Sequence, residues 1–139
     1  ATLDQLGRVR SMSCAADCGG GGAYGLRGRD TTCAVARFNN AGSQVTVLLL
    51  QNPTNEPVDA TVFFWSPAGT LLATHTPAAP LAAKALLIVS TAGLPGLTGT
   101  SGSITVVHNA PYGALAGKTV ALEPATGFSF DSPMQPRPR

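Results

Sequence analysis

Short apolar segments separated by turn-forming residues fill most of the chain from residue 34 onward. The segments are at most eight residues long, and no stretch with the period of an α-helix separates them. Turns such as Ser66-Pro67-Ala68-Gly69 combine Pro at the second position with Gly at the fourth. This pattern predicts an all-β domain with strands at 34–38, 44–51, 59–65, 70–76, 85–90, 103–108, 119–123 and 128–130.

Alternation of apolar and polar side chains indicates which face of a strand is buried. Ile104 and Val106 are expected to point into the core, and so are Val120 and Leu122. Among the aromatic residues, Phe64, Phe128 and Phe130 are expected in the core.

Two strands, 44–51 and 59–65, carry apolar residues on both faces. Such strands are either covered on both sides or present an apolar surface to a partner. We assign the partner surface to the side chains Leu48, Leu50, Phe63 and Trp65.

About eight short strands in a chain of 139 residues favour one antiparallel β-sandwich. We expect three parts: an extended Cys/Gly-rich arm and loop at 1–33, the β-sandwich at 34–131, and a Pro/Arg-rich tail at 132–139. The arm precedes the run Gly19–Gly22, so it can reach a neighbouring subunit or fold onto its own domain. Its apolar anchors are Leu3, Leu6, Val9 and Met12.

The three cysteines, Cys14, Cys18 and Cys33, all lie in the first quarter of the chain. A structural zinc site would need a fourth ligand at matching spacing, and both histidines are distant in sequence. A disulfide fits better, and the longer loop favours a bridge from Cys33 to Cys14 or Cys18. Cysteine usage of this kind is typical of secreted chains.

Charge excludes some classes of partner. Charged residues make up only 12% of the chain and the net charge is +2. Between residues 38 and 136 the only basic residues are Lys84 and Lys118, so no basic stripe for nucleic acid is expected. No apolar run approaches the roughly 20 residues that span a bilayer.

Three motifs could carry chemistry, and each lacks its context. Residues 20–25 match the glycine pattern of a dinucleotide loop without a preceding strand or a following helix. Residues 113–119 are one residue short of a phosphate-binding loop. His75 and His108 end strands, where exposed rims are expected, and no nucleophile motif accompanies them. We therefore expect no enzyme activity, no cofactor and no metal.

The segment VLLLQNPTNEPVDATVFFW, followed by SPAGTLLAT and later by SGSITVVHNAPYGALAGKTVALEP, resembles bacterial secreted immunoglobulin-like or fibronectin-III-like modules. The resemblance covers about residues 38–131. It implies an extracellular adhesive, spacer or structural role and carries no site residues over.

These observations predict a structural or adhesive subunit of an extracellular or cell-surface assembly. It would act through protein–protein contacts with copies of itself or another protein, and a self-assembling filament is one form of this hypothesis. The alternative is a carbohydrate-binding module that stacks sugars on Trp65 and Tyr112, and a small hydrolase ranks third.

Overall fold

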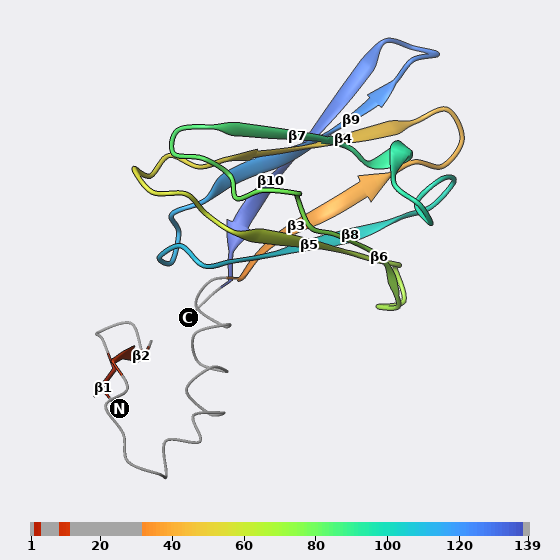
Figure 1. Cartoon of the computed structure of the whole chain (residues 1–139). Coiled ribbons are helices and arrows are strands. Elements are labelled where there is room, and N and C mark those ends of the chain that lie inside the picture. The colour runs from red at the N-terminus through yellow and green to blue at the C-terminus, as the bar shows by residue number, and fades with distance from the viewer. Residues whose placement is uncertain (1, 4–8, 12–31, 138–139) are drawn as a thin grey trace.

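The computed structural model describes residues 2–3, 9–11 and 32–137, and it is all-β apart from one short 3-10 helix (Figure 1). All eight strands expected from the sequence are confirmed, with ends that shift by a few residues. The elements are β1 (Thr2–Leu3), β2 (Val9–Ser11), β3 (Thr32–Asn39), β4 (Val45–Gln51), β5 (Ala60–Trp65), β6 (Leu71–His75), β7 (Leu86–Ser90), η1 (Thr91–Gly93), β8 (Ser101–His108), β9 (Ala116–Glu123) and β10 (Phe128–Pro136).

Strands β3 to β10 form a single antiparallel sheet in the order β6-β5-β8-β3-β10-β9-β4-β7. The sheet curls into a half-barrel, so that its two ends face each other across the core (Figure 1). The separate strands β1 and β2 pair with each other. Most of the expected N-terminal arm, including Leu6, Met12, Cys14 and Cys18, lies outside the described residues.

Strand β10 makes the sheet continuous. It pairs with β9 from Phe128 to Pro133 and with β3 from Met134 to Pro136. The change of partner falls at Pro133, which has no N–H to donate to a ladder. Residues 132–136 therefore belong to the sheet, where the sequence indicated the start of a tail.

The core lies between the two facing halves of the sheet. Ile104 and Val106 are fully buried, as the alternation predicted. The ring of Phe38 meets that of Phe64 edge to face, with centroids 5.5 Å apart. Side chains from the other half complete the core, including Leu48, Leu50 and Val89.

Buried polar side chains close one end of the core by bonding to each other and to backbone. Asn40 Oδ1 accepts hydrogen bonds from Thr91 Oγ1 at 2.9 Å and from the Thr46 backbone N–H at 3.0 Å. Thr46 Oγ1 donates to the Asn39 carbonyl at 2.8 Å. Buried polar groups are tolerated when their hydrogen bonds are satisfied, so a threonine can point into this core.

The face of β9 that is buried is the opposite of the one predicted from the sequence. Thr119 is buried and donates from Oγ1 to the Arg37 carbonyl at 2.8 Å. Its inward position places Val120 and Leu122 on the opposite, outer face of the strand. The sequence prediction that these two residues point inward is wrong, because it treated the hydroxyl of Thr119 as a sign of exposure.

Candidate protein–protein contact surface

The apolar residues of β4 take the opposite faces from those predicted. Leu48 and Leu50 are fully buried, together with Thr46, and Val45, Val47 and Leu49 point outward. Leu48 and Leu50 therefore contribute to the core and cannot form the predicted contact surface. Leu48 and Leu50 share a strand face with Thr46, and the Thr46 hydroxyl is hydrogen-bonded inside the protein.

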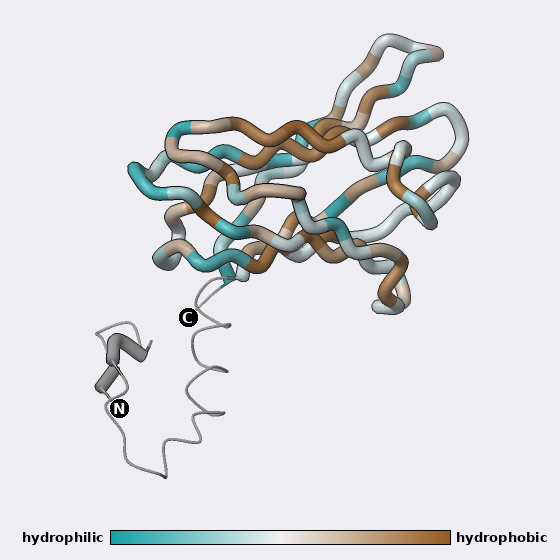
Figure 2. The backbone as a smooth tube through the Cα atoms, viewed as in Figure 1, coloured by the Kyte–Doolittle hydropathy of each residue, from teal (hydrophilic) through white to brown (hydrophobic). Residues whose placement is uncertain are grey.

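The outward residues of β4 continue into an apolar surface across three strands. Register places Leu49 beside Ile88 of β7 and Val45 beside Leu122 of β9. Ile88 is 62% exposed, Leu86 is 55% exposed and Leu122 is 43% exposed. Figure 2 shows β4 and β7 as a hydrophobic run along this part of the molecule. We call this surface the β7–β4–β9 face, and it consists of Val45, Val47, Leu49, Leu86, Ile88, Val120 and Leu122.

Charge is nearly absent from the β7–β4–β9 face. On β9, the charged side chain on the same outer face as Val120 and Leu122 is that of Lys118. Its Nζ lies 2.5 Å from the Asp131 carboxylate, so its charge is paired. Strand β7 and the outward positions of β4 contain no charged residue. Native proteins commonly protect sheet edges with charges or prolines, and β7, the edge strand of this face, has neither.

A second exposed apolar group lies on the β9–β10 hairpin, which projects from the rest of the sheet (Figure 1). Phe128 and Phe130 are among the exposed large hydrophobic residues, so the expectation that they join the core is wrong. Their strand does pair with β9, but the hairpin extends beyond the opposing half of the sheet, so Phe128 remains 65% exposed and Phe130 49% exposed.

Phe63 and Trp65 lie on the outer face of β5 and are half-buried. Their ring centroids are 6.3 Å apart, and Trp65 Nε1 donates to Thr105 Oγ1 at 2.8 Å. They belong to the other half of the sheet from Leu48 and Leu50. The structure therefore does not join the four predicted contact residues into one surface.

The structure also separates the predicted sugar-binding pair. Trp65 is opposite Ser103 near the start of β8, whereas Tyr112 follows the end of that strand at His108. Five strand residues of about 3.4 Å each span roughly 17 Å. The structure therefore places Trp65 and the end of β8 that leads to Tyr112 apart along the strand.

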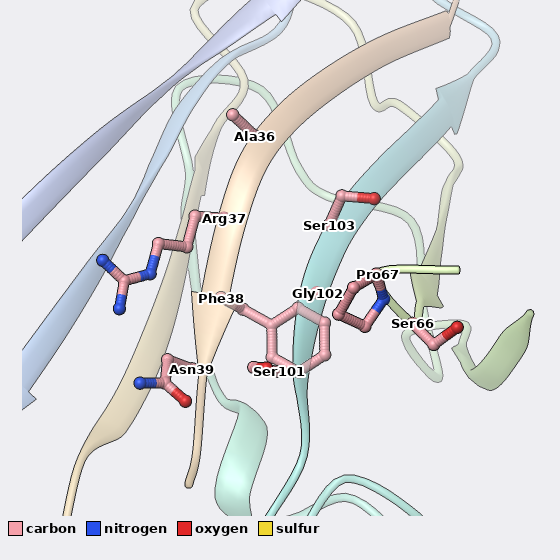
Figure 3. A pocket seen from close by; sticks show the side chains of 9 residues that line it. All are labelled: Ala36, Arg37, Phe38, Asn39, Ser66, Pro67, Ser101, Gly102 and Ser103. Carbon is pink, nitrogen blue, oxygen red and sulfur yellow. The ribbon is translucent and has the colours of Figure 1, made fainter. Parts of the chain in front are cut away.

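A hollow of about 410 Å³ opens beside the bulge of β3, as Figure 3 shows. Arg37 and Asn39 stand on one side, and the turn at Ser66 and Pro67 stands on the other. Arg37 is the one charged residue among those that line it. The Ser66 hydroxyl already accepts hydrogen bonds from two backbone N–H groups of its own turn. None of the residues that line the hollow is a His, Asp or Glu that could act as a base for a serine hydroxyl.

Cys33 and His108 meet inside the fold although 75 residues separate them in sequence. Cys33 Sγ lies 3.6 Å from His108 Nε2, and both side chains are buried. His108 Nδ1 has no hydrogen-bond partner among the residues that the structure describes. His108 is therefore a core residue, and its expected position at an exposed rim is wrong. The sequence offered no signal for this contact beyond the alternation in β3 and β8 that points both side chains into the core.

Cys33 is a free thiol in the structure, so it does not form the predicted bridge to Cys14 or Cys18. Its inward phase on β3 places Sγ in the core beside His108. Burial raises the pKa of the thiol, which disfavours the reactive thiolate. The other two cysteines, Cys14 and Cys18, lie outside the described residues.

The buried pair predicts a stability maximum at neutral to mildly alkaline pH. Burial lowers the pKa of His108 from 6.5, so below that pH the unfolded chain binds a proton that the folded chain does not. Burial raises the pKa of Cys33 from 9.0, so above that pH the unfolded chain loses a proton that the folded chain keeps. The free energy of unfolding therefore falls when the pH is lowered through the range of His108 and when it is raised through the range of Cys33.

Chemical denaturation across the pH range measures this profile. Cys33→Val, which places an apolar side chain at the same buried site, should weaken the alkaline decline and leave the acid decline in place. A Cys33→Val profile that keeps the full alkaline decline would assign it to other groups.

Within residues 2–3, 9–11 and 32–137, no three His, Cys, Asp or Glu side chains gather to form a metal site. The same residues include no helix that is long and apolar enough to cross a membrane.

The fold and the surface define an all-β protein built on one curled antiparallel sheet with an open apolar face. A solved protein structure from Thermotoga maritima is similar, with a TM-score of 0.63 and 11% sequence identity over 76% of this chain and 92% of that chain. At this identity the likeness shows the fold alone. No protein-family model and no curated protein matches the chain.

Proposed function

We propose that this protein is a structural or adhesive subunit that associates with copies of itself through the β7–β4–β9 face. The observation that carries the proposal is the exposure of Leu86, Ile88 and Leu122 on one nearly uncharged sheet face. Burying a leucine or isoleucine side chain completely contributes roughly 1.5–3 kcal/mol. Covering three that are about half exposed would stabilise a contact by several kcal/mol, before the cost of association.

The proposal includes an extracellular or cell-surface location. It rests on the low charge and on the resemblance to secreted immunoglobulin-like modules, and the free, buried thiol of Cys33 adds no support to it. A sandwich of the immunoglobulin type is part of the same proposal, and the facing halves of the curled sheet are compatible with it. The sugar-binding alternative is weaker, because Trp65 and Tyr112 lie at opposite ends of β8.

Sedimentation of the full chain over a range of concentrations tests the proposal. We expect species heavier than the 14.1 kDa of one chain. The double variant Leu86→Thr, Leu122→Thr replaces two exposed apolar side chains with residues that suit a strand, and it should weaken association at least about tenfold. Leu71→Thr is the matched control, because Leu71 is similarly exposed on β6 at the far edge of the sheet.

Two results would contradict the proposal. One is a parent chain that stays at the mass of a single chain at every concentration. The other is a double variant that associates as strongly as Leu71→Thr does. Circular dichroism should show that all three proteins keep the same strand content, so that a change in association is not a change in folding.

A further inference from the structure

Strand β7 is an edge of the sheet, and the hydrogen bonds beside it show which of its backbone groups point away from β4. The Asn52 N–H donates to the Ala85 carbonyl at 3.0 Å, directly before the β4–β7 ladder. Hydrogen-bonded pairs recur at every second residue of an antiparallel ladder. Leu87 and Val89 therefore exchange bonds with β4, and the N–H and C=O groups of Leu86, Ile88 and Ser90 point to the free edge.

Among the backbone groups of the described residues, none is hydrogen-bonded to those edge groups. Five residues make up the strand, and Ile88 is its centre. The free groups are consequently arranged symmetrically about Ile88. An antiparallel copy of the same strand would place Ile88 opposite Ile88 of the second chain and Leu86 opposite Ser90, and each such pair can exchange two hydrogen bonds.

We propose that two copies of this protein pair their β7 strands antiparallel about a two-fold axis at Ile88, so that the two sheets become continuous. This inference rests on the proposed function, self-association at β7, and adds a contact at the strand edge beside the β7–β4–β9 face, which the pairing itself leaves uncovered. An open strand edge is completed by another strand, whose backbone supplies the hydrogen bonds. A second β7 also meets no like charge, because the strand has none, and it extends the apolar β7–β4–β9 face across the axis.

The opposite edge of the sheet is a poorer candidate. Strand β6 pairs with β5 through a register shift between Phe64 and Trp65, and such irregularities protect edges from further pairing. It also carries the polar residues Thr74 and His75. Strand β7 pairs with β4 in unbroken register, so its edge is straight enough to accept a partner.

The two-fold geometry predicts a specific crosslink. Facing residues of a hydrogen-bonded antiparallel pair have Cα atoms about 5.5 Å apart, within the range of about 4.4–6.8 Å that disulfides span. Under mild oxidation, two chains of the Ile88→Cys variant should form a disulfide between their introduced thiols. Leu86→Cys, which faces Ser90 of the second chain, should form little of it.

Trypsin digestion without reduction identifies the crosslink. Cleavage after Lys84 and Lys118 releases residues 85–118, which contain no native cysteine. A dimer of this peptide from Ile88→Cys supports the proposal. An equal yield from Leu86→Cys and Ile88→Cys would overturn the register, and no dimer peptide from Ile88→Cys would overturn the pairing.

Ile88→Pro provides a second measurement, because it removes an N–H that points away from β4. It should weaken association at least about tenfold while the chain still unfolds cooperatively, whereas Ile88→Val, which keeps the N–H, should associate like the parent. A further outcome is that the double variant Leu86→Thr, Leu122→Thr weakens association while Ile88→Pro associates like the parent and Ile88→Cys forms no dimer peptide. In that case the strand pairing is wrong and the proposed function stands. A parent chain that never associates overturns both.

Discussion

Replacing Gly102 with alanine is expected to lower the free energy of unfolding by about 3 kcal/mol or more. A Cβ at this position would lie 1.8 Å from the carbonyl oxygen of Trp65 and 2.9 Å from its carbonyl carbon. These are backbone atoms of the neighbouring strand β5, so no rotation of a side chain relieves the clash. The strands β5 and β8 would have to separate where they form half of the core wall.

Urea denaturation of Gly102→Ala measures this loss, with Gly93→Ala as the matched control. A Cβ on Gly93 meets no atom within 4 Å, and its backbone is not left-handed, so its change should stay within about 0.5 kcal/mol. Equal stability of the two variants would show that β5 and β8 do not approach as closely as the structure has them. The result also concerns the hollow of Figure 3, since Gly102 lines it.

Phe64→Ala is expected to cost about 3–5 kcal/mol, because it leaves a large cavity in a close-packed core. Phe64 is fully buried and packs edge to face on Phe38. Phe128→Ala removes the same side chain from a position that is 65% exposed, so it should cost well under half as much.

Thermal or urea unfolding of both phenylalanine variants decides between two descriptions of the β9–β10 hairpin. Comparable losses would mean that Phe128 is packed in the folded protein. A small loss at Phe128 leaves the ring available as a second contact. That matters for assembly, because β7 pairing about a two-fold axis closes on itself, and a filament needs a second contact surface.

The sequence by itself determined the strands. All eight strands of the curled sheet were recoverable, because apolar segments of strand length alternate with turns whose backbone chemistry is local. Alternation also predicted the inward direction of Ile104 and Val106 correctly, since the outward neighbours Ser103 and Thr105 are polar.

Only the tertiary structure decided which face of β4 and β9 is buried. Thr46 and Thr119 point inward, where backbone carbonyl groups of β3 accept their hydroxyl protons, and a sequence does not show which carbonyls will be near. That choice buries Leu48 and Leu50 and exposes Leu122 and the outward side of β4. The candidate site was therefore assigned to the wrong residues of β4, although an outer apolar surface was expected.

Long-range pairing decided the rest. Strand β10 unites the sheet because it changes partner at Pro133, and Cys33 reaches His108 because β3 and β8 are neighbours. The open edge at β7 likewise exists only because the strand order ends there. Local residue patterns specify strands and turns, whereas the order of strands depends on contacts between residues far apart in the chain, and these set both the core and the exposed face.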